Sequence, residues 1–292
     1  MKSILVVLLM LSAARGQVPG EDLLQKILTA NVRNGKVDYL VIRRDHWAEL
    51  TTCLDQFASV DPAKLNENDR LAFYINLYNA SMIRAVIQHL NHDWTPASSG
   101  FAVFKERDIR LLHQKISLDR LEHKIIRKSF KEPRVHVALV CGAVSCPPLL
   151  PRAYRGKDLN TVLHANMVRF VTDTTRNPID VQKRKLRLSR IFEWFHDDFG
   201  GEAKIPAYVD SFHPGDLRKF ELSFAPYSWK LNIAPPASGK WVRIKTYQGS
   251  AAPAGSILSV VSRKDGRITV RLPFTTGKTL ELSAEDVRPY GK

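Results

Sequence analysis

Residues 131–150, in which an apolar run is followed by two cysteines, constrain the fold of this chain more than any other stretch. From residue 135 to residue 140 every side chain except that of His136 is apolar, so both faces of the segment have to be covered. This pattern predicts a strand in the centre of a sheet. A titratable histidine on such a strand is costly unless it is paired or faces a cleft.

Two thiols follow the predicted strand. Cys141 and Cys146 flank a turn that begins at Gly142, and Pro147 and Pro148 then restrict the backbone. Polar side chains at the end of a buried strand often carry the chemistry of α/β enzymes. The segment is therefore either a functional site or a buried strand that leads into a proline turn, and both interpretations stay open.

Residues 1–16 have the pattern of an export signal. Lys2 supplies a positive start, residues 4–11 are apolar, and Ala14 and Gly16 are small residues placed for cleavage before Gln17. The apolar run is too short to span a bilayer, and no later segment is long and apolar enough to do so. We expect export to a periplasmic or extracellular location, with a retained anchor or a buried helix as the alternative.

The composition excludes few partners. A chain of 292 residues, 44% of them hydrophobic, suits one large domain or one large and one small domain. The formal net charge of +15 favours anionic partners such as membrane surfaces, envelope polymers or nucleic acid without choosing among them. We expect no cofactor and no nucleic-acid motif, because phosphate-binding glycine loops, helix-turn-helix patterns and zinc-finger spacings are missing.

The strongest helical signal covers residues 67–90, with Asn66 as the expected cap. Its apolar side chains recur at helical spacing: Leu71, Ile75, Tyr78, Met82 and Val86. Asn76 and Asn79 lie one turn apart among aromatic residues, and a buried amide must find hydrogen-bond partners. Asn79 therefore either satisfies a neighbouring loop or belongs to a site.

Other elements follow from the same periodicities. We expect helices at 21–32, 45–57, 118–130, 158–173, after Ser189, and at 208–220; an extended segment at 37–42; a hairpin at 101–114; and a basic strand or hairpin arm at 181–188. Cys53 lies on the apolar face of the second of these helices, which predicts a core residue.

The composition changes after a linker at residues 235–238. Short alternating segments at 241–247, 257–262, 267–272 and 279–282, a hairpin turn at Asp265-Gly266 and a helical turn at 284–286 predict a small SH3-like β-barrel. From Gly239 onward ten lysines and arginines face four acidic residues. We interpret this module as an appendage for an anionic envelope polymer or membrane surface, or else as a stabilising cap with a solvated basic face.

Several motifs together resemble the domain-of-unknown-function 547 family. They are RLAFYINLYNA at 70–80, SLDRLEH at 117–123, EPRVHVALVCGAVSCPPL at 132–149, WFHDDFG at 194–200 and YSWKLN at 227–232. The resemblance covers residues 37–232 and implies one domain over 17–234. It implies an α+β fold, a helix-rich core around a central sheet, similar to papain-like and transglutaminase-like cysteine enzymes.

A nucleophilic cysteine needs a base within hydrogen-bond reach and a group that orients the base. We predict Cys146 as the better exposed thiol of its pair and therefore as the nucleophile. His136 or His123 is the candidate base, and Glu122 or Asn79 is the candidate orienting group. The histidines precede the cysteine, which is not the order found in papain.

Three function classes remain. The first is a secreted cysteine-dependent hydrolase or acyl transferase whose substrate the residues do not identify. The second is a non-catalytic envelope binding or structural protein with a Cys141–Cys146 disulfide, since an oxidising compartment favours such a bond. The third is a metal site formed by these two cysteines and histidines, although no second ligand pair of matching spacing is present.

Overall fold

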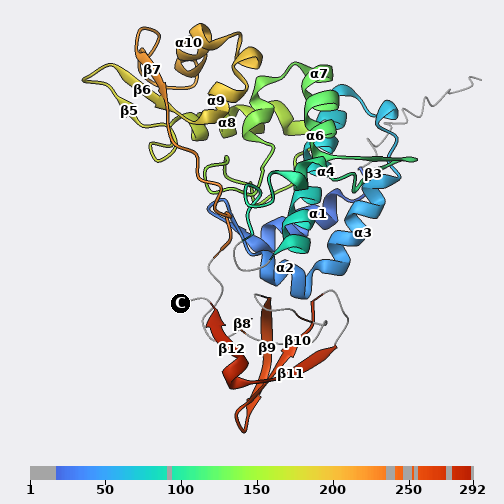
Figure 1. Cartoon of the computed structure of the whole chain (residues 1–292). Helices are drawn as coiled ribbons and strands as arrows, with labels where there is room; N and C mark the ends of the chain where they lie inside the picture. The colour runs from blue at the N-terminus through green and yellow to red at the C-terminus, as the bar shows by residue number, and fades with distance from the viewer. Residues whose placement is uncertain are drawn as a thin grey trace, which may run out of the picture.

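The computed structural model describes residues 18–90, 94–234, 241–245, 252, 256–273 and 278–290. The expected export signal and the linker at 235–238 lie outside the described residues. The architecture mixes helices and sheets, which confirms the α+β class. Figure 1 shows a helix-rich body and, below it in that view, a C-terminal sheet drawn in red.

The centre of the body is α4 (Glu67–His89). Asn66 accepts a hydrogen bond from the backbone N–H of Asp69 and caps the helix as expected. The helices that contact α4 include α1 (Glu21–Asn31), α2 (Tyr39–Asp45) and α3 (Trp47–Ala58). Because neighbours cover α4 on several sides, its middle is buried all round rather than along one stripe.

Most of the predicted helices are confirmed. The helix predicted for 118–130 is built from α6 (Leu118–Arg120), a π-helical segment η2 (Leu121–Ile126) and α7 (Arg127–Phe130). The helix predicted for 158–173 is α8 (Leu159–Val171), and Ser189 caps α9 (Arg190–Trp194).

Two predictions for the body are wrong. The extended segment predicted for 37–42 ends at Val37, because Asp38 accepts the N–H of Val41 and starts the helix α2. The helix predicted for 208–220 is α10 (Ile205–Asp210) and ends ten residues early. Asp210 accepts the N–H of Leu217 at 2.8 Å and so holds the chain in a turn.

The central strand predicted for residues 135–140 does not form. Pro133–Val137 is a short 3-10 helix, η3, which Glu132 caps by accepting the N–H of Arg134, and a loop follows it. The partners that a sheet would supply come from helices instead. Asn79 of α4 binds the backbone of Ala138 and Val140, and Asn166 of α8 donates to the carbonyl of Val137.

The described body has three small peripheral sheets in place of a central one. Their strands are β1 (Val32–Arg33) and β2 (Lys36–Val37); β3 (Ile109–Leu111) and β4 (Gln114–Ile116); and β5 (Ile179–Asp180), β6 (Lys185–Leu188) and β7 (Glu221–Phe224). All pairs are antiparallel except β6 with β7. The hairpin predicted for 101–114 is β3–β4, and its expected first arm is instead the short helix α5 (Ala102–Lys105).

The C-terminal sheet has five antiparallel strands in the order β11-β10-β9-β8-β12. They are β8 (Trp241–Ile244), β9 (Ile257–Lys264), β10 (Arg267–Arg271), β11 (Thr279–Ser283) and β12 (Val287–Tyr290), with the helical turn η7 (Ala284–Asp286) before the last. These elements match the predicted strands and turn. Residues such as Val242, Leu258 and Val270 form a core within the sheet.

The sheet also packs against the body. The Arg43 guanidinium donates to the carbonyl of Ile257, and the Arg44 guanidinium lies 5.4 Å from the centre of the Trp241 ring. Trp241 and Ile257 join the apolar core of the body. The α2 segment that carries both arginines therefore connects the two parts, as Figure 1 shows.

Short 3-10 turns complete the body at Pro62–Lys64, Gly156–Asp158, His196–Phe199 and Glu202–Lys204. Among the described residues, no helix combines the length and the apolar character needed to cross a bilayer.

Candidate functional site

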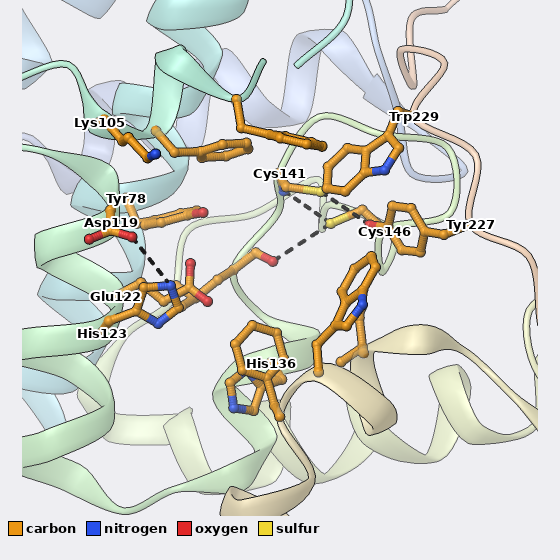
Figure 2. A pocket seen from close by; sticks show the side chains of 16 residues that line it. Tyr78, Lys105, Asp119, Glu122, His123, His136, Cys141, Cys146, Tyr227 and Trp229 are labelled. Atoms are coloured by element: carbon orange, nitrogen blue, oxygen red, sulfur yellow. Dashed lines mark hydrogen bonds and ion pairs between the residues drawn. The ribbon is translucent and has the colours of Figure 1, made fainter. Parts of the chain in front are cut away.

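A cavity of about 490 Å³ opens between α4, η2, α9 and the loop that follows η3. Aromatic side chains form much of its wall: Phe101, Phe104, Trp194, Phe195, Tyr227 and Trp229. Four of the predicted site residues line the cavity: Glu122, His123, His136 and Cys146. Cys141 lines the cavity as well. Figure 2 shows both thiols on one side of the cavity and Glu122 and His123 on another.

The two cysteines are free thiols held together by their loop. The backbone N–H of Cys141 donates to Cys146 Sγ at 3.0 Å. Gly142 makes the turn with a φ of 81°, where a Cβ would also meet the Val86 side chain at 3.2 Å. Cys141 is half-buried, whereas Cys146 is only 4% exposed. The prediction that Cys146 is the better exposed thiol is therefore wrong.

The hydrogen bonds around the two sulfurs distinguish them chemically. Hydrogen bonds from the Cys146 thiol and from the Tyr227 hydroxyl, which lies 3.2 Å away, lower the pKa of Cys141 despite its burial. Burial raises the pKa of Cys146 well above its ordinary value, and the neighbouring Cys141 adds to that effect. The two shifts run in opposite directions, so Cys141 is the thiol of this pair that ionises more readily.

The segment 227–232 holds the cysteine loop in place. The N–H of Val144 donates to the carbonyl of Lys230, and the N–H of Asn232 donates to the carbonyl of Gly142, each at 2.8 Å. Tyr227 reaches Cys141 from the start of the same segment. From the sequence we use this motif only for the resemblance and do not predict Tyr227 as a site residue, although a tyrosine at the start of a family motif was a usable signal.

An aromatic cluster at the cavity wall surrounds Tyr227. The Tyr227 ring lies 4.8 Å from the Trp194 ring and 4.7 Å from the Trp229 ring, measured between centroids. Trp194 stays 43% exposed. Aromatic surface that remains open beside a cavity can contact an apolar or planar ligand.

His136 is paired away from the thiols. Its Nε2 lies 2.6 Å from Asp198 Oδ2, and the Arg127 Nε donates to the same oxygen at 2.6 Å. The His136 ring stacks on Phe195, with 4.0 Å between centroids. Although burial acts to raise it, hydrogen bonds from His136 and Arg127 hold the pKa of Asp198 well below its usual value. Among the described contacts, His136 makes no hydrogen bond to either cysteine, so the structure does not bring it to a thiol as a base.

The π-helical segment η2 presents Glu122 and His123 to the cavity. His123 Nδ1 lies 3.0 Å from an Arg127 nitrogen, and its Nε2 lies 3.6 Å from Asp119. Glu122 hydrogen bonds to the Tyr78 hydroxyl. Its negative charge also opposes ionisation of Cys141, so the two groups interact across the cavity. Single π-helical turns within α-helices occur often at functional sites.

Asn79 serves the loop rather than the cavity. Its amide nitrogen donates to the carbonyl of Ala138 at 2.9 Å, and its amide oxygen accepts the N–H of Val140 at 3.0 Å. Asn76 binds both backbone groups of Tyr154 in the same way. Because the loop uses both ends of the Asn79 amide, the structure does not place it as an orienting group for a histidine.

The described residues contain no cluster of three or more His, Cys, Asp or Glu side chains arranged to hold a metal ion. The two cysteines contact each other and Tyr227, while the nearby histidines are paired with Asp198, Arg127 and Asp119.

Comparison with known proteins identifies one family. A family model described as "Protein of unknown function, DUF547" matches residues 62–171. This range contains both cysteines, Glu122, His123 and His136, whereas Tyr227 lies beyond it. It is narrower than the expected range of 37–232. Searches of the curated proteins and of the solved structures each found no match.

Proposed function

We propose that this chain, which belongs to the DUF547 family, is a cysteine-dependent hydrolase or acyl transferase whose nucleophile is Cys141. The observation that carries the proposal is the Cys141 thiol at the wall of an aromatic cavity, hydrogen bonded to Tyr227 and to a second thiol. Such hydrogen bonds favour the thiolate, which is the nucleophilic form of cysteine.

In this proposal the Cys141 thiolate attacks the carbonyl carbon of a bound acyl group. A thioester forms as the bond to the leaving group breaks, and water or a second acceptor then takes the acyl group from sulfur. Glu122 faces the same cavity, and we assign it two proton transfers: its carboxylate accepts the proton that the Cys141 thiol loses and then donates that proton to the leaving group. The aromatic wall would hold an apolar or aromatic acyl group.

The test uses p-nitrophenyl esters with aliphatic and aromatic acyl groups. We expect ester cleavage and, by mass spectrometry after rapid acid quenching, an acyl group on the peptide that contains Cys141. Cys141→Ser should abolish both. Cys53→Ser is the matched control, because Cys53 is fully buried and should leave cleavage unchanged. Turnover that survives in Cys141→Ser, or an acyl group on another residue, would refute the proposal.

A non-catalytic binding protein is the second candidate. The partners of the two histidines favour this alternative. His136 pairs with Asp198 and His123 with Arg127, so among the described residues neither histidine contacts a thiol as a catalytic base would. In this alternative the cavity holds an apolar ligand, and the two cysteines serve structure, with a Cys141–Cys146 disulfide in an oxidising compartment. It predicts that an aromatic ester changes the fluorescence of Trp194 and Trp229 without being cleaved.

The cellular location and the fold relationships of the chain do not depend on the acyl chemistry. We propose export, a papain-like or transglutaminase-like relationship for the body, and an SH3-like architecture for the C-terminal sheet. For the sheet, the support is the antiparallel strand order and the single helical turn before β12. We further propose that its excess of basic residues binds an anionic envelope polymer or membrane surface.

A further inference from the structure

The two sulfurs of the cavity are placed for chemistry with each other. Cys146 hydrogen bonds to the Cys141 thiol, and its Sγ lies 3.0 Å from the Cys141 backbone nitrogen. The Cys146 sulfur also lies 3.9 Å from the carbonyl of Leu139 on the loop behind it. In Figure 2 the Cys141 and Cys146 side chains meet beside Tyr227.

The two thiols differ in how a reagent can reach them. Cys141 is half-buried and lines the cavity, whereas Cys146 is almost fully buried. A small reagent that enters the cavity therefore meets Cys141 first. The third cysteine, Cys53, is fully buried among the helices, where burial raises its pKa to about 12, so it serves as an internal control.

This combination is the one that reversible thiol oxidation requires. An ionised and accessible cysteine reacts with an oxidant, and an adjacent thiol then resolves the product before further oxidation. Cys141 has the first role and Cys146 the second by their exposure and by their hydrogen bond. Tyr227 contributes by stabilising the sulfur that reacts.

We propose that Cys141 reduces a hydroperoxide and that Cys146 resolves the resulting sulfenic acid, so that the cavity also carries a thiol peroxidase-type activity. The Cys141 thiolate attacks the distal peroxide oxygen, and the O–O bond breaks. The departing alkoxide or hydroxide takes a proton from water. Cys146 then attacks the Cys141 sulfur, a disulfide forms, and the sulfenic hydroxyl leaves as water with the Cys146 proton. Two thiols lose two electrons, and one peroxide gains them.

The activity goes beyond the proposed acyl chemistry and does not need it. Both reactions begin with the Cys141 thiolate, but only the oxidation uses the Cys146 sulfur as a reactant. The disulfide also removes the nucleophile of the proposed hydrolase. Peroxide would therefore stop ester cleavage, and a dithiol reductant would restore it.

The test starts from the full chain, reduced with dithiothreitol and desalted. One equivalent of hydrogen peroxide should give a Cys141–Cys146 linkage by non-reducing peptide mapping, while Cys53 remains a free thiol. In Cys146→Ser the sulfenic acid has no resolving partner, so dimedone should label Cys141. In Cys141→Ser the Cys146 thiol should remain reduced for at least tenfold longer than Cys141 does in the unaltered chain.

Tyr227→Phe separates a chemical role of the hydroxyl from a packing role. Without the hydrogen bond from Tyr227, the pKa of the Cys141 thiol should rise by roughly one unit. The reaction of Cys141 with peroxide should therefore slow by about tenfold at a pH below the pKa of Cys141. The rate should recover as the pH rises above the pKa of Cys141 in the variant. A rate that falls equally at every pH would contradict the role of Tyr227.

Three results would overturn the proposal. They are oxidation of Cys141 no faster than that of Cys53, oxidation of Cys146 in Cys141→Ser at the unaltered rate, and accumulation of sulfinic acid at Cys141 instead of the disulfide. The oxidation experiments distinguish this proposal from the proposed acyl chemistry. A chain that fails to cleave esters but forms the linkage refutes the acyl proposal alone, and the converse refutes this one alone.

Discussion

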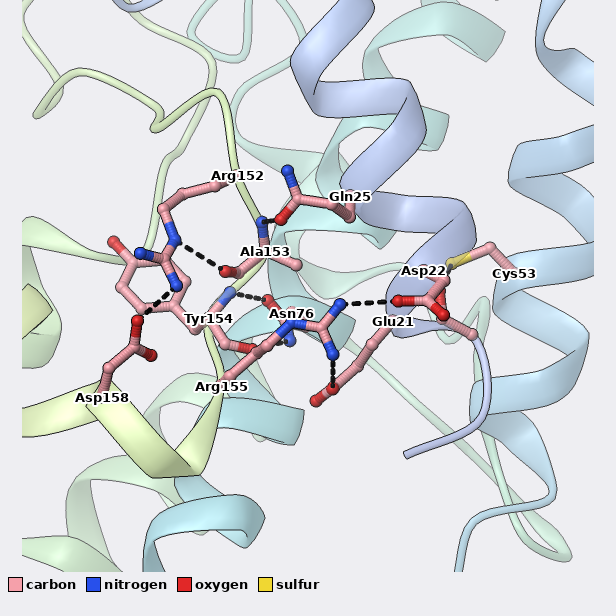
Figure 3. Close-up of polar contacts among 11 residues, drawn as sticks. Glu21, Asp22, Gln25, Cys53, Asn76, Arg152, Ala153, Tyr154, Arg155 and Asp158 are labelled. Carbon is pink, nitrogen blue, oxygen red and sulfur yellow. Dashed lines mark hydrogen bonds and ion pairs between the residues drawn. The ribbon is translucent and has the colours of Figure 1, made fainter. Parts of the chain in front are cut away.

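Glu21 is a carboxyl group that the fold holds at an unusual pKa. It begins α1 and is nearly fully buried, and burial raises its pKa to about 7, although Arg155 opposes the shift. The Arg155 guanidinium donates to Glu21 at 3.3 Å and to Asp22 at 2.6 Å, as Figure 3 shows. Within the described part of the chain, the second Glu21 oxygen has no hydrogen-bond partner.

We predict that Glu21→Gln stabilises the protein increasingly as the pH rises from 5 to 8. A carboxyl whose pKa is raised on folding favours the folded state while it is protonated, and this contribution is lost as the pH rises through the folded pKa. The gain should reach about 1–3 kcal/mol at pH 8, the cost of an incompletely paired buried group. Urea unfolding at several pH values measures it. Asp22→Asn, at a side chain 70% exposed, is the control, and a gain that does not vary with pH would contradict the prediction.

Asn79→Ala should destabilise the protein by roughly 2–4 kcal/mol. The change leaves the Ala138 carbonyl and the Val140 N–H without their partner, and each buried unsatisfied group costs about 1–3 kcal/mol. Thermal and urea unfolding measure the loss. The exposed Asn68 of the same helix is the matched control, and Asn68→Ala should change stability by less than about 0.5 kcal/mol.

Individual residues divide into those that the sequence could identify and those that it could not. Cys53 was predicted correctly, because its exposure depends on the helix that carries it. The relative exposure of Cys141 and Cys146 depends on the distant segment 227–232, which lies against their loop. Spacing along the chain contains no information about that contact.

At the scale of elements, η3 explains why the central strand was predicted wrongly. A short apolar run without alternation fits a buried strand and a buried helical turn equally well. Proline at the first helical position and Glu132 as the cap were local signals for the helical turn. The hydrogen bonds from Asn79 and Asn166 that replace a sheet come from other elements, and no local pattern predicts them.

Asp198 connects three such elements, and we predict that Asp198→Asn lowers stability at pH 7 by roughly 1–3 kcal/mol. Its carboxylate binds His136 of η3 and Arg127 of α7, and the change removes the negative charge that both side chains contact. A carboxyl whose pKa is lowered on folding stabilises the protein above its unfolded pKa, and this contribution is lost as the pH falls through the folded pKa.

The unaltered protein should therefore lose stability below about pH 4 more steeply than Asp198→Asn. Urea unfolding between pH 2 and pH 7 measures the two curves. Asp197→Asn is the control, because the neighbouring side chain is 86% exposed. Parallel curves for Asp198→Asn and the unaltered chain would show that the carboxylate is not a source of the acid sensitivity.

At the scale of the whole molecule, the two parts were not equally predictable. The C-terminal sheet follows from local alternation and from the Asp265-Gly266 turn, where both residues have positive φ angles. The cavity is assembled from residues as far apart as Tyr78 and Tyr227. The sequence identified most of its titratable residues through their motifs, but the contacts among them depend on how helices and loops pack over long distances.

The last prediction concerns the net charge of the C-terminal sheet. If the sheet binds anionic surfaces, the double change Arg263→Glu and Lys264→Glu should weaken binding of the chain to heparin or to anionic vesicles by at least about tenfold at low salt, since each exposed cation near such a surface contributes roughly 1 kcal/mol. Both side chains are exposed at the β9–β10 hairpin. Lys157→Glu with Lys204→Glu changes the net charge equally at exposed positions of the body and is the matched control. Binding measured by isothermal titration should also fall steeply with added salt, because exposed charges are screened over about 10 Å at 0.1 M. Equal weakening by the two double variants would show that the total charge, and not the sheet, attracts the polyanion.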